Sequence, residues 1–94
     1  MQSLFSVGDL AESTAGRDKG KIYLLIKVEE NTAYCVNGRD RKIDNPKKKK
    51  IRHLKRVSTA RLSEFAERIQ KGESVGNEKL FRSIKAQTQK KQED

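Results

Sequence analysis

Residues 16–28 of the chain are Gly16-Arg17-Asp18-Lys19-Gly20-Lys21-Ile22-Tyr23-Leu24-Leu25-Ile26-Lys27-Val28. The first half of this stretch places charged side chains between two glycines, which is typical of a tight surface loop. The second half alternates with a period of two, which predicts a β-strand over residues 22–28. Because both faces are largely apolar at the start of this strand, we expect it to be the central strand of a sheet.

Further strands are expected on both sides of this one. A weaker strand signal at residues 7–11 precedes the loop, and Glu29-Glu30-Asn31 predicts a hairpin leading to a strand at residues 32–36. Asn37-Gly38 is a strong turn signal, since both residue types tolerate positive φ. Residues 47–57 interleave apolar and basic side chains, which favours an edge strand. Several short strands separated by turns predict a small barrel or sandwich.

The hydrophobic period changes in the last third of the chain. An amphipathic helix is predicted from Leu62, Phe65, Ala66 and Ile69, which are spaced i, i+3, i+4 and i+7. Ser58 or Thr59 can cap its N-terminus, and Gly72 is a natural end. A second helix is expected to begin at Asn77, with an apolar face of Leu80, Phe81 and Ile84. Short isolated helices are marginal in water, so we expect these apolar side chains to pack together, against the barrel or against a partner.

Charge is the strongest signal in the composition. Twenty-two Lys and Arg face thirteen Asp and Glu, giving a net charge of +9 and a pI near 9.9. Residues 16–57 alone hold 14 basic and 5 acidic side chains and so carry +9, whereas residues 1–15 carry −2 and residues 58–94 carry +2. Such a balance suits a domain that neutralises phosphates. The alternative is a soluble protein whose basic face binds nothing in particular.

Composition also limits the class of protein. Only 33% of the 94 residues are hydrophobic, which predicts one small domain with a modest core. No run approaches the roughly 18 apolar residues of a membrane span, and the N-terminus lacks a signal-peptide pattern. A single cysteine, Cys35, cannot form an internal disulfide. We therefore expect a soluble cytoplasmic protein without a membrane partner.

Residues 16–21, with Val7-Gly8-Asp9 before them and an apolar strand after them, resemble a KOW motif. This motif occurs in several large-subunit ribosomal proteins and in transcription elongation factors of the antitermination type. In that family it forms a strand, a loop with a key glycine and a second strand within an SH3-like barrel, and Gly20 matches the glycine. The family's apolar positions match Val7, Leu10, Ile22, Leu24 and Ile26. The stretch at residues 45–54, Asn-Pro-Lys-Lys-Lys-Lys-Ile-Arg-His-Leu, is most similar to the ribosomal protein L14e family and its short bacterial relatives.

The resemblance covers residues 4–57 and does not extend to the two helices. Pattern and resemblance together predict a mainly β fold: a five-stranded SH3-like (KOW) barrel in residues 1–57, and a C-terminal extension of two α-helices with a polar tail in residues 58–94.

Three cationic clusters are candidate contacts for RNA. Gly16 and Gly20 allow a tight loop whose backbone N–H groups can face phosphates, and Asp18 can hold the loop through a local side-chain bond. The alternatives are a solvated loop, a disordered linker, a charged edge strand or a localisation signal. Whether the clusters share one face is left open by the sequence. The candidate RNA-binding residues are Gly16, Arg17, Lys19, Gly20, Lys21, Arg39, Arg41, Lys42, Lys47, Lys48, Lys49, Lys50, Arg52, His53 and Lys55.

Other kinds of site are not expected. Tyr23 and Tyr34 are the plausible pair for base stacking, but core packing is the favoured role for both. One histidine and one cysteine cannot supply a four-residue zinc site, and Cys35 is expected to be a buried, inert thiol. No catalytic triad or phosphate-binding Walker loop is recognisable, so we expect no catalytic residues, no metal and no cofactor.

These observations favour a non-catalytic RNA-binding protein that is ribosomal or ribosome-associated and takes part in translation. Its expected partners are ribosomal RNA and, in addition, ribosomal or translation-factor proteins. One alternative is a KOW protein-interaction module of a transcription or translation factor, which would need an exposed apolar patch. Another is a nonspecific DNA-binding protein, which a preference for A-form RNA would exclude.

Overall fold

The computed structural model describes residues 5–89, and within this range the side chains of residues 58–61 and 89 are outside the description. The polar tail that the sequence predicts lies largely beyond the described residues. In chain order the elements are β1 (Asp9–Ser13), β2 (Ile22–Val28), β3 (Thr32–Val36), β4 (Lys47–Lys50), the 3-10 helix η1 (Ile51–His53), β5 (Leu54–Arg61), α1 (Ser63–Gln70) and α2 (Asn77–Gln89).

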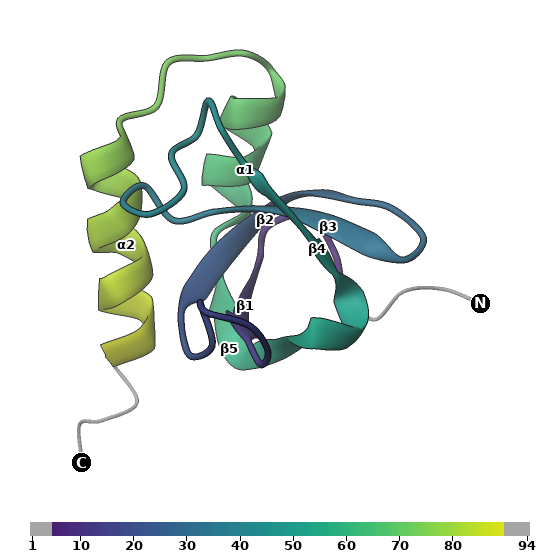
Figure 1. The fold of residues 1–94 in the computed structure, drawn as a ribbon. Helices are drawn as coiled ribbons and strands as arrows, with labels where there is room; N and C mark the ends of the chain where they lie inside the picture. The colour runs from purple at the N-terminus through teal and green to yellow at the C-terminus, as the bar shows by residue number, and fades with distance from the viewer. Residues whose placement is uncertain (1–4, 90–94) are drawn as a thin grey trace.

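The five strands form one antiparallel sheet in the order β4-β3-β2-β1-β5. Figure 1 shows this sheet curling round on itself, with α1 and α2 on its outer side. The predicted mainly β fold, a five-stranded SH3-like barrel followed by two helices, is confirmed, and β2 is the central strand as predicted.

The predicted edge strand over residues 47–57 is instead two strands separated by η1. The physical reason is the sheet order. β4 pairs with β3 at one edge, and β5 pairs with β1 at the other edge, so the chain must turn between them. β5 also continues to Arg61, four residues past the end of the stretch that the sequence assigned to the barrel.

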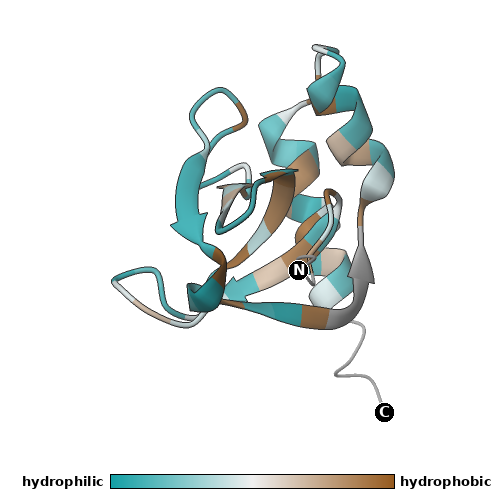
Figure 2. Cartoon of the chain, turned by 90° about the vertical axis from the view of Figure 1, so that its right-hand side faces the viewer, coloured by the Kyte–Doolittle hydropathy of each residue, from teal (hydrophilic) through white to brown (hydrophobic). Residues whose placement is uncertain are grey.

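Both faces of β2 are buried, and each belongs to a different core. Tyr23 and Leu25 point into the barrel core, whose buried members are completed by Phe5, Ala11, Ala33, Cys35 and Leu54. Leu24 and Ile26 point to the opposite face, into a helix-covered core completed by Leu10, Val36, Val57, Ala66, Leu80 and Ile84. Figure 2 shows the resulting contrast between hydrophobic central strands and largely hydrophilic loops.

The apolar stripes of both helices pack on the outer face of the sheet, as predicted. Leu80 and Ile84 are buried in the helix-covered core, and Leu62, Phe65 and Ile69 lie at its margin. The packing predicted for Phe81 differs: its side chain is half-buried, and the Arg39 guanidinium carbon lies 4.0 Å from its ring centroid. The helices therefore share a core with the strands.

The predicted cap of the first helix is wrong. Ser58 and Thr59 lie within β5, and the N-cap position of α1 is Leu62, which makes no side-chain capping bond. The predicted end is confirmed: beyond Lys71, the Gly72 N–H donates to the Ile69 carbonyl at 3.0 Å. Neither α1 nor α2, nor any other helix within residues 5–89, has the length and apolarity to cross a membrane.

Gly20 is expected to resist replacement because of its backbone conformation. Its φ is +95°, while a Cβ added there would meet no atom within 4 Å. The strain of a side chain would therefore come from φ rather than from a clash. We expect Gly20→Val to lower the free energy of unfolding by about 1–2 kcal/mol, and Gly20→Asn to cost clearly less, since Asn tolerates positive φ. Urea unfolding of both variants measures this, and equal losses in the two would contradict it.

Candidate nucleic-acid interface

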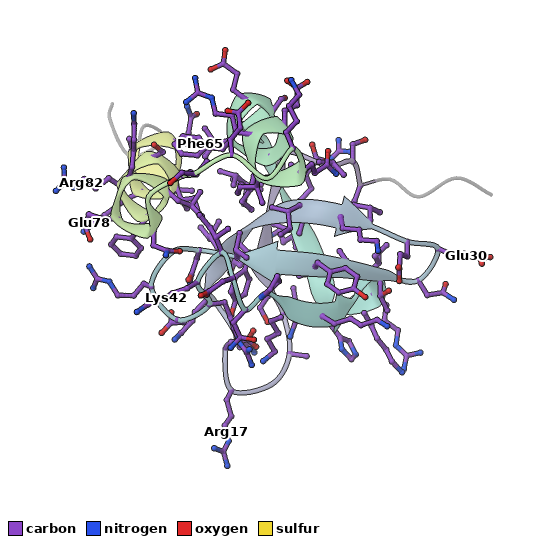
Figure 3. The ribbon with its side chains drawn as sticks, turned by 90° about the horizontal axis from the view of Figure 1, so that it is seen from above. Arg17, Glu30, Lys42, Phe65, Glu78 and Arg82 are labelled. Carbon is purple, nitrogen blue, oxygen red and sulfur yellow. The ribbon has the colours of Figure 1, made fainter. Side chains whose placement is uncertain are left out.

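The loop between β1 and β2 (loop 14–21) is closed at its base by the backbone. The Ser13 N–H donates to the Lys21 carbonyl at 2.8 Å. Arg17 and Lys19 are exposed near the tip, and Arg17 points away from the barrel in Figure 3. The loop itself projects away from α1 (Figures 1 and 3). Two cations are thus presented to solvent from a short loop with fixed ends.

Asp18 points from the same loop into the barrel and is only 7% exposed. Its Oδ1 accepts hydrogen bonds from the Ser13 hydroxyl at 2.9 Å and the Lys49 ammonium at 3.2 Å, and its Oδ2 accepts one from the Tyr23 hydroxyl at 2.8 Å. The Lys47 ammonium lies 3.6 Å from this carboxylate. The expected local side-chain bond of Asp18 is therefore confirmed in the Ser13 contact, and the carboxylate in addition ties the loop to β2 and β4.

The protonation states in this cluster follow from its contacts. Burial by itself raises the pKa of Asp18, but hydrogen bonds from Tyr23, Ser13 and Lys49 outweigh burial and hold it well below its ordinary value. Burial, followed by the Asp18 contact, raises the pKa of Tyr23 far above its ordinary value. At neutral pH the cluster is therefore a charged carboxylate that accepts bonds from a neutral phenol and an ammonium group.

The four lysines of β4 do not share one environment. Lys47 and Lys49 are paired across the ladder with Cys35 and Ala33, which belong to the barrel core. Since paired residues lie on the same face of a sheet, these two lysines point inward toward Asp18. The other two lysines of the strand point outward. The alternation of a β-strand thus divides a run that looks uniform in sequence.

Lys49 is only 8% exposed, and its ammonium also donates to the Ala15 carbonyl at 3.3 Å. A direct contact with RNA needs an exposed ammonium group, so the structure gives Lys49 a different place from the one that the sequence suggested. The exposure of Lys47 lies between that of Lys49 and that of the outward-facing lysines, because its side chain remains 34% exposed beside Asp18. We therefore assign Lys49 a structural role under loop 14–21.

The connection between β3 and β4 (loop 37–45) is organised by one amide side chain. Asn37 Oδ1 accepts the backbone N–H groups of Arg39, Asp40 and Arg41 at 3.0, 2.9 and 3.0 Å. This arrangement is an Asx-type turn in which the side chain replaces a backbone acceptor. It holds the two arginines on a compact turn next to β3.

The same loop is docked on the N-terminal end of α2. Of the predicted Asn37-Gly38 turn only Gly38 adopts a positive φ, at +81°, and a side chain there would collide with the Asn77 carbonyl oxygen. The Asn77 side chain, which the sequence suggested as a helix cap, accepts the Ile43 N–H at 2.8 Å instead. Loop 37–45 thus lies against Asn77 at two points, through the close approach of the Gly38 backbone and through the Ile43 hydrogen bond.

Loops 14–21 and 37–45 meet at an ion pair. The Lys21 ammonium lies 2.9 Å from the Asp40 carboxylate, and this contact, together with Asn37, lowers the pKa of Asp40. On another side of loop 14–21, the Thr14 N–H donates to the His53 carbonyl in η1 at 2.9 Å. Loop 14–21 is therefore joined to loop 37–45, to β4 and to η1.

The two loops form what we call the loop surface, defined by the exposed side chains of Arg17, Lys19, Lys21, Arg39 and Lys42. Figure 3 shows Arg17 at the tip of one loop and Lys42 on the neighbouring loop. Gly16 and Gly20 are exposed in the backbone of the first loop, and Arg41 is half-buried in the second. The sequence left open whether these loops are neighbours. The Lys21–Asp40 contact shows that they are, although an ion pair with both side chains 44% exposed adds little stability by itself.

Not every candidate residue reaches the loop surface. Lys50 and Arg52 line a different groove, together with Glu30 and Asn31 of the β2–β3 hairpin, and the Ile51 N–H donates to the Asn31 carbonyl at 2.9 Å. In Figure 3, Glu30 and Lys42 lie at opposite ends of the molecule. Of the remaining candidates, Lys48 and Lys55 are exposed on β4 and β5, and His53 is half-buried in η1.

The two tyrosines and the cysteine differ in accessibility. Tyr23 is 1% exposed and is closed off from a base, whereas Tyr34 is half-buried and has two lysines beside its ring. Cys35 is buried as expected, and burial raises the pKa of its thiol to about 12. Within residues 5–89 no three His, Cys, Asp or Glu side chains are grouped so that they could hold a metal ion. Comparison with models of known families and with curated protein sequences finds no match to this chain.

The division of the β4 lysines predicts unequal effects on stability. Lys49→Met removes one partner of a buried ion pair and leaves Asp18 with Lys47 as its remaining cation. We expect a loss of about 3 kcal/mol in the free energy of unfolding, near the low end for breaking a buried pair. Lys48→Met is the matched control on the next, exposed position and is expected to change stability by less than about 0.5 kcal/mol. Urea unfolding decides, and similar losses in both would contradict the structural role of Lys49.

The lowered pKa of Asp18 predicts acid sensitivity. A carboxylate with a depressed pKa in the folded state contributes stability above its unfolded pKa, near pH 4, and this contribution is lost as the pH falls further. We therefore expect Asp18→Asn to be less stable than the parent at pH 7. The difference between the two in the free energy of unfolding is expected to narrow steadily from pH 4 to pH 2. Asp44→Asn, at an exposed position, is the control and is expected to show a small gap at all pH values. A gap for Asp18→Asn that stays constant with pH would argue against this assignment.

Proposed function

We propose that this chain is a non-catalytic RNA-binding protein of the KOW type that binds structured RNA, acts in or on the ribosome, and contacts phosphates through the loop surface. The observation that carries this proposal is the joining of loops 14–21 and 37–45 by the Lys21–Asp40 ion pair. Their exposed cations are held on neighbouring loops of one rigid barrel, where binding residues concentrate.

Preorganisation of the loop surface supports binding of a polyanion. Asp18 fixes loop 14–21 from inside through three hydrogen bonds, and Asn37 fixes the other loop through three more. The loops therefore lose little conformational freedom when a ligand binds, which favours affinity. Asp18 is buried and positions cations from inside the barrel, whereas Asp40 and Asp44 are exposed on loop 37–45 and offset part of the positive charge there.

The choice of structured RNA rests on what the site offers. Cationic side chains on two loops match phosphate oxygens, which supply affinity but no sequence information. The buried ring of Tyr23 is closed to stacking, so the loop surface suits recognition of backbone shape, as in folded RNA. The resemblance of residues 4–57 to KOW proteins supports the same proposal, since Gly20 lies in the loop between the first two strands with φ of +95°.

A non-catalytic role is part of the proposal. The polar cluster around Asp18 resembles a catalytic site only in composition. Its hydroxyl, phenol and ammonium groups all donate hydrogen bonds to one carboxylate. Among the described residues, no buried side-chain nitrogen or oxygen lacks a hydrogen-bond partner. This cluster is better explained as the foundation of loop 14–21 than as a reacting centre.

Salt-dependent binding to an RNA hairpin tests the proposal. Each phosphate contact contributes roughly 0.7–0.9 to the slope of log K against log salt. Replacing Arg17, Lys19 and Lys42 together by Ala is therefore expected to reduce the magnitude of the slope by about 2 and to weaken binding. The matched control makes the same change in charge away from the loop surface, by replacing Arg68 of α1, Lys71 at its C-cap and Lys79 of α2 by Ala, and is expected to keep the slope.

Fluorescence anisotropy at several salt concentrations gives both slopes. Point substitutions are preferable to deleting residues 58–94, since that deletion would remove half of β5 and uncover the helix-covered core. Salt-independent affinity, tighter binding of duplex DNA than of the RNA hairpin, or equal slopes for the two triple variants would each overturn the proposed site.

A further inference from the structure

A row of three side chains crosses the outer face of the sheet at its β4 edge. Tyr34 of β3 is paired with Lys27 of β2 on one side and with Lys48 of β4 on the other. Directly paired residues have their side chains on the same face, so the three lie side by side. The ammonium groups lie 5.3 Å (Lys27) and 5.8 Å (Lys48) from the centroid of the Tyr34 ring.

The row borders an apolar groove where α1 stops covering the sheet. Its lining consists of Ile26, Lys27, Tyr34, Pro46, Ile69 and Gln70, and its volume is about 360 Å³. Gln70, the last residue of α1, donates through Nε2 to the Ile26 carbonyl at 3.0 Å. This bond fixes the end of α1 against β2. The Oε1 atom of Gln70 is the hydrogen-bond acceptor of the same amide group. The lining thus combines the Tyr34 ring with three aliphatic side chains, and Lys27 and Gln70 are its polar members.

We propose that this groove holds an unpaired nucleobase of the bound RNA, stacked on Tyr34, with the adjoining phosphates at Lys27 and Lys48. The proposal rests on the RNA-binding function proposed above and assigns a second contact, distinct from the loop surface. It concerns a nucleotide that is flipped out of a helix or lies in a bulge, because only such a base presents its ring for stacking.

The chemistry of the groove favours a nucleotide over an apolar side chain of a protein. The ammonium groups of Lys27 and Lys48 lie over the Tyr34 ring, so a base that stacks on this ring displaces one of them, and the displaced ammonium group can then meet the adjoining phosphate. The carboxylate near this rim, Glu29, lies 3.5 Å from Lys27, and both side chains are largely exposed, so this ion pair holds Lys27 only weakly. The volume of the groove is near the lower limit of about 300 Å³ for ligand pockets, which suits a single ring system.

β4 connects this groove with the loop surface. Lys47 and Lys49 point inward and support loop 14–21 through Asp18, while Lys48 points outward beside Tyr34. Because β4 is an edge strand, RNA bound at the loop surface can continue along this edge and reach the groove. Phosphate contacts and a stacked base would then lie on the two sides of one strand.

The test uses two RNA hairpins that differ in one position. One hairpin is fully paired in its stem, and the other carries a single bulged 2-aminopurine, whose fluorescence falls when it stacks on an aromatic ring. We expect the parent protein and Tyr34→Phe to quench this fluorescence and to bind the bulged hairpin more tightly than the paired one. Tyr34→Leu keeps an apolar side chain against the core and is expected to abolish the quenching and to weaken binding of the bulged hairpin roughly 5- to 100-fold.

The outcomes separate this inference from the proposed function. Binding of both hairpins with equal affinity, without quenching and without an effect of Tyr34→Leu, would overturn the groove assignment and leave the loop surface intact; this is also the result expected if the groove holds a protein side chain. Failure of the parent protein to bind either hairpin in a salt-dependent manner would overturn the proposed function itself. Thermal unfolding of Tyr34→Leu checks that this variant is folded. Quenching by the parent protein tests base stacking in the groove without any variant.

Discussion

The contact between the Asp18 carboxylate and the Lys49 ammonium is the constraint on which most of this structure depends. It joins the loop after β1 to the edge strand β4 from inside the barrel, at 3.2 Å and with both side chains less than 10% exposed. An unpaired charge at this depth would be strongly unfavourable, so the loop cannot lift away from β4 without separating the pair. The tip cations Arg17 and Lys19 owe their fixed position to this buried contact.

The net charge of this protein therefore differs from the positive charge that is available to contact a ligand. The excess of +9 is present in the sequence, but Lys49 is buried against Asp18, Lys21 is paired with Asp40, and Arg39 lies over Phe81. Lys49 is buried and supports the surface, whereas Lys21 and Arg39 remain exposed on it but already have a partner in the protein. A count of lysines overestimates the number that can meet a ligand, and the alternation within β4 explains why.

Much of the fold could be predicted from local patterns. The strand at residues 22–28 and the hairpin after it follow from period-two alternation and turn residues, and the apolar faces of both helices follow from helical spacing. The errors arose where distant partners decide. Ser58 and Thr59 have suitable side chains for a helix cap, but pairing of β5 with β1 extends the strand through them. η1 likewise exists because β4 and β5 belong to opposite edges of the sheet, which no local pattern encodes.

For the candidate site, sequence identified the loops and could not identify their connections. Asp18 was recognisable as a residue that shapes a loop, but its bonds to Tyr23 and Lys49 require the closed barrel. The row of Lys27, Tyr34 and Lys48 depends on the register of three strands. A period of two predicts that alternate lysines of residues 47–50 face opposite sides of the strand, and this signal alone separates Lys49 from Lys48.

The docking of loop 37–45 on α2 has a consequence for cooperativity. The loop is held by its backbone approach at Gly38 and by the Ile43–Asn77 hydrogen bond, and α2 is in turn held by Leu80 and Ile84 in the helix-covered core. Local opening of either element breaks contacts of the other, so helix and loop belong to one unit that opens together. α2, although it lies outside the barrel, thereby sets how long the arginines of the turn stay in place, and the ordering of this surface depends on a helix that is more than 30 residues away in sequence.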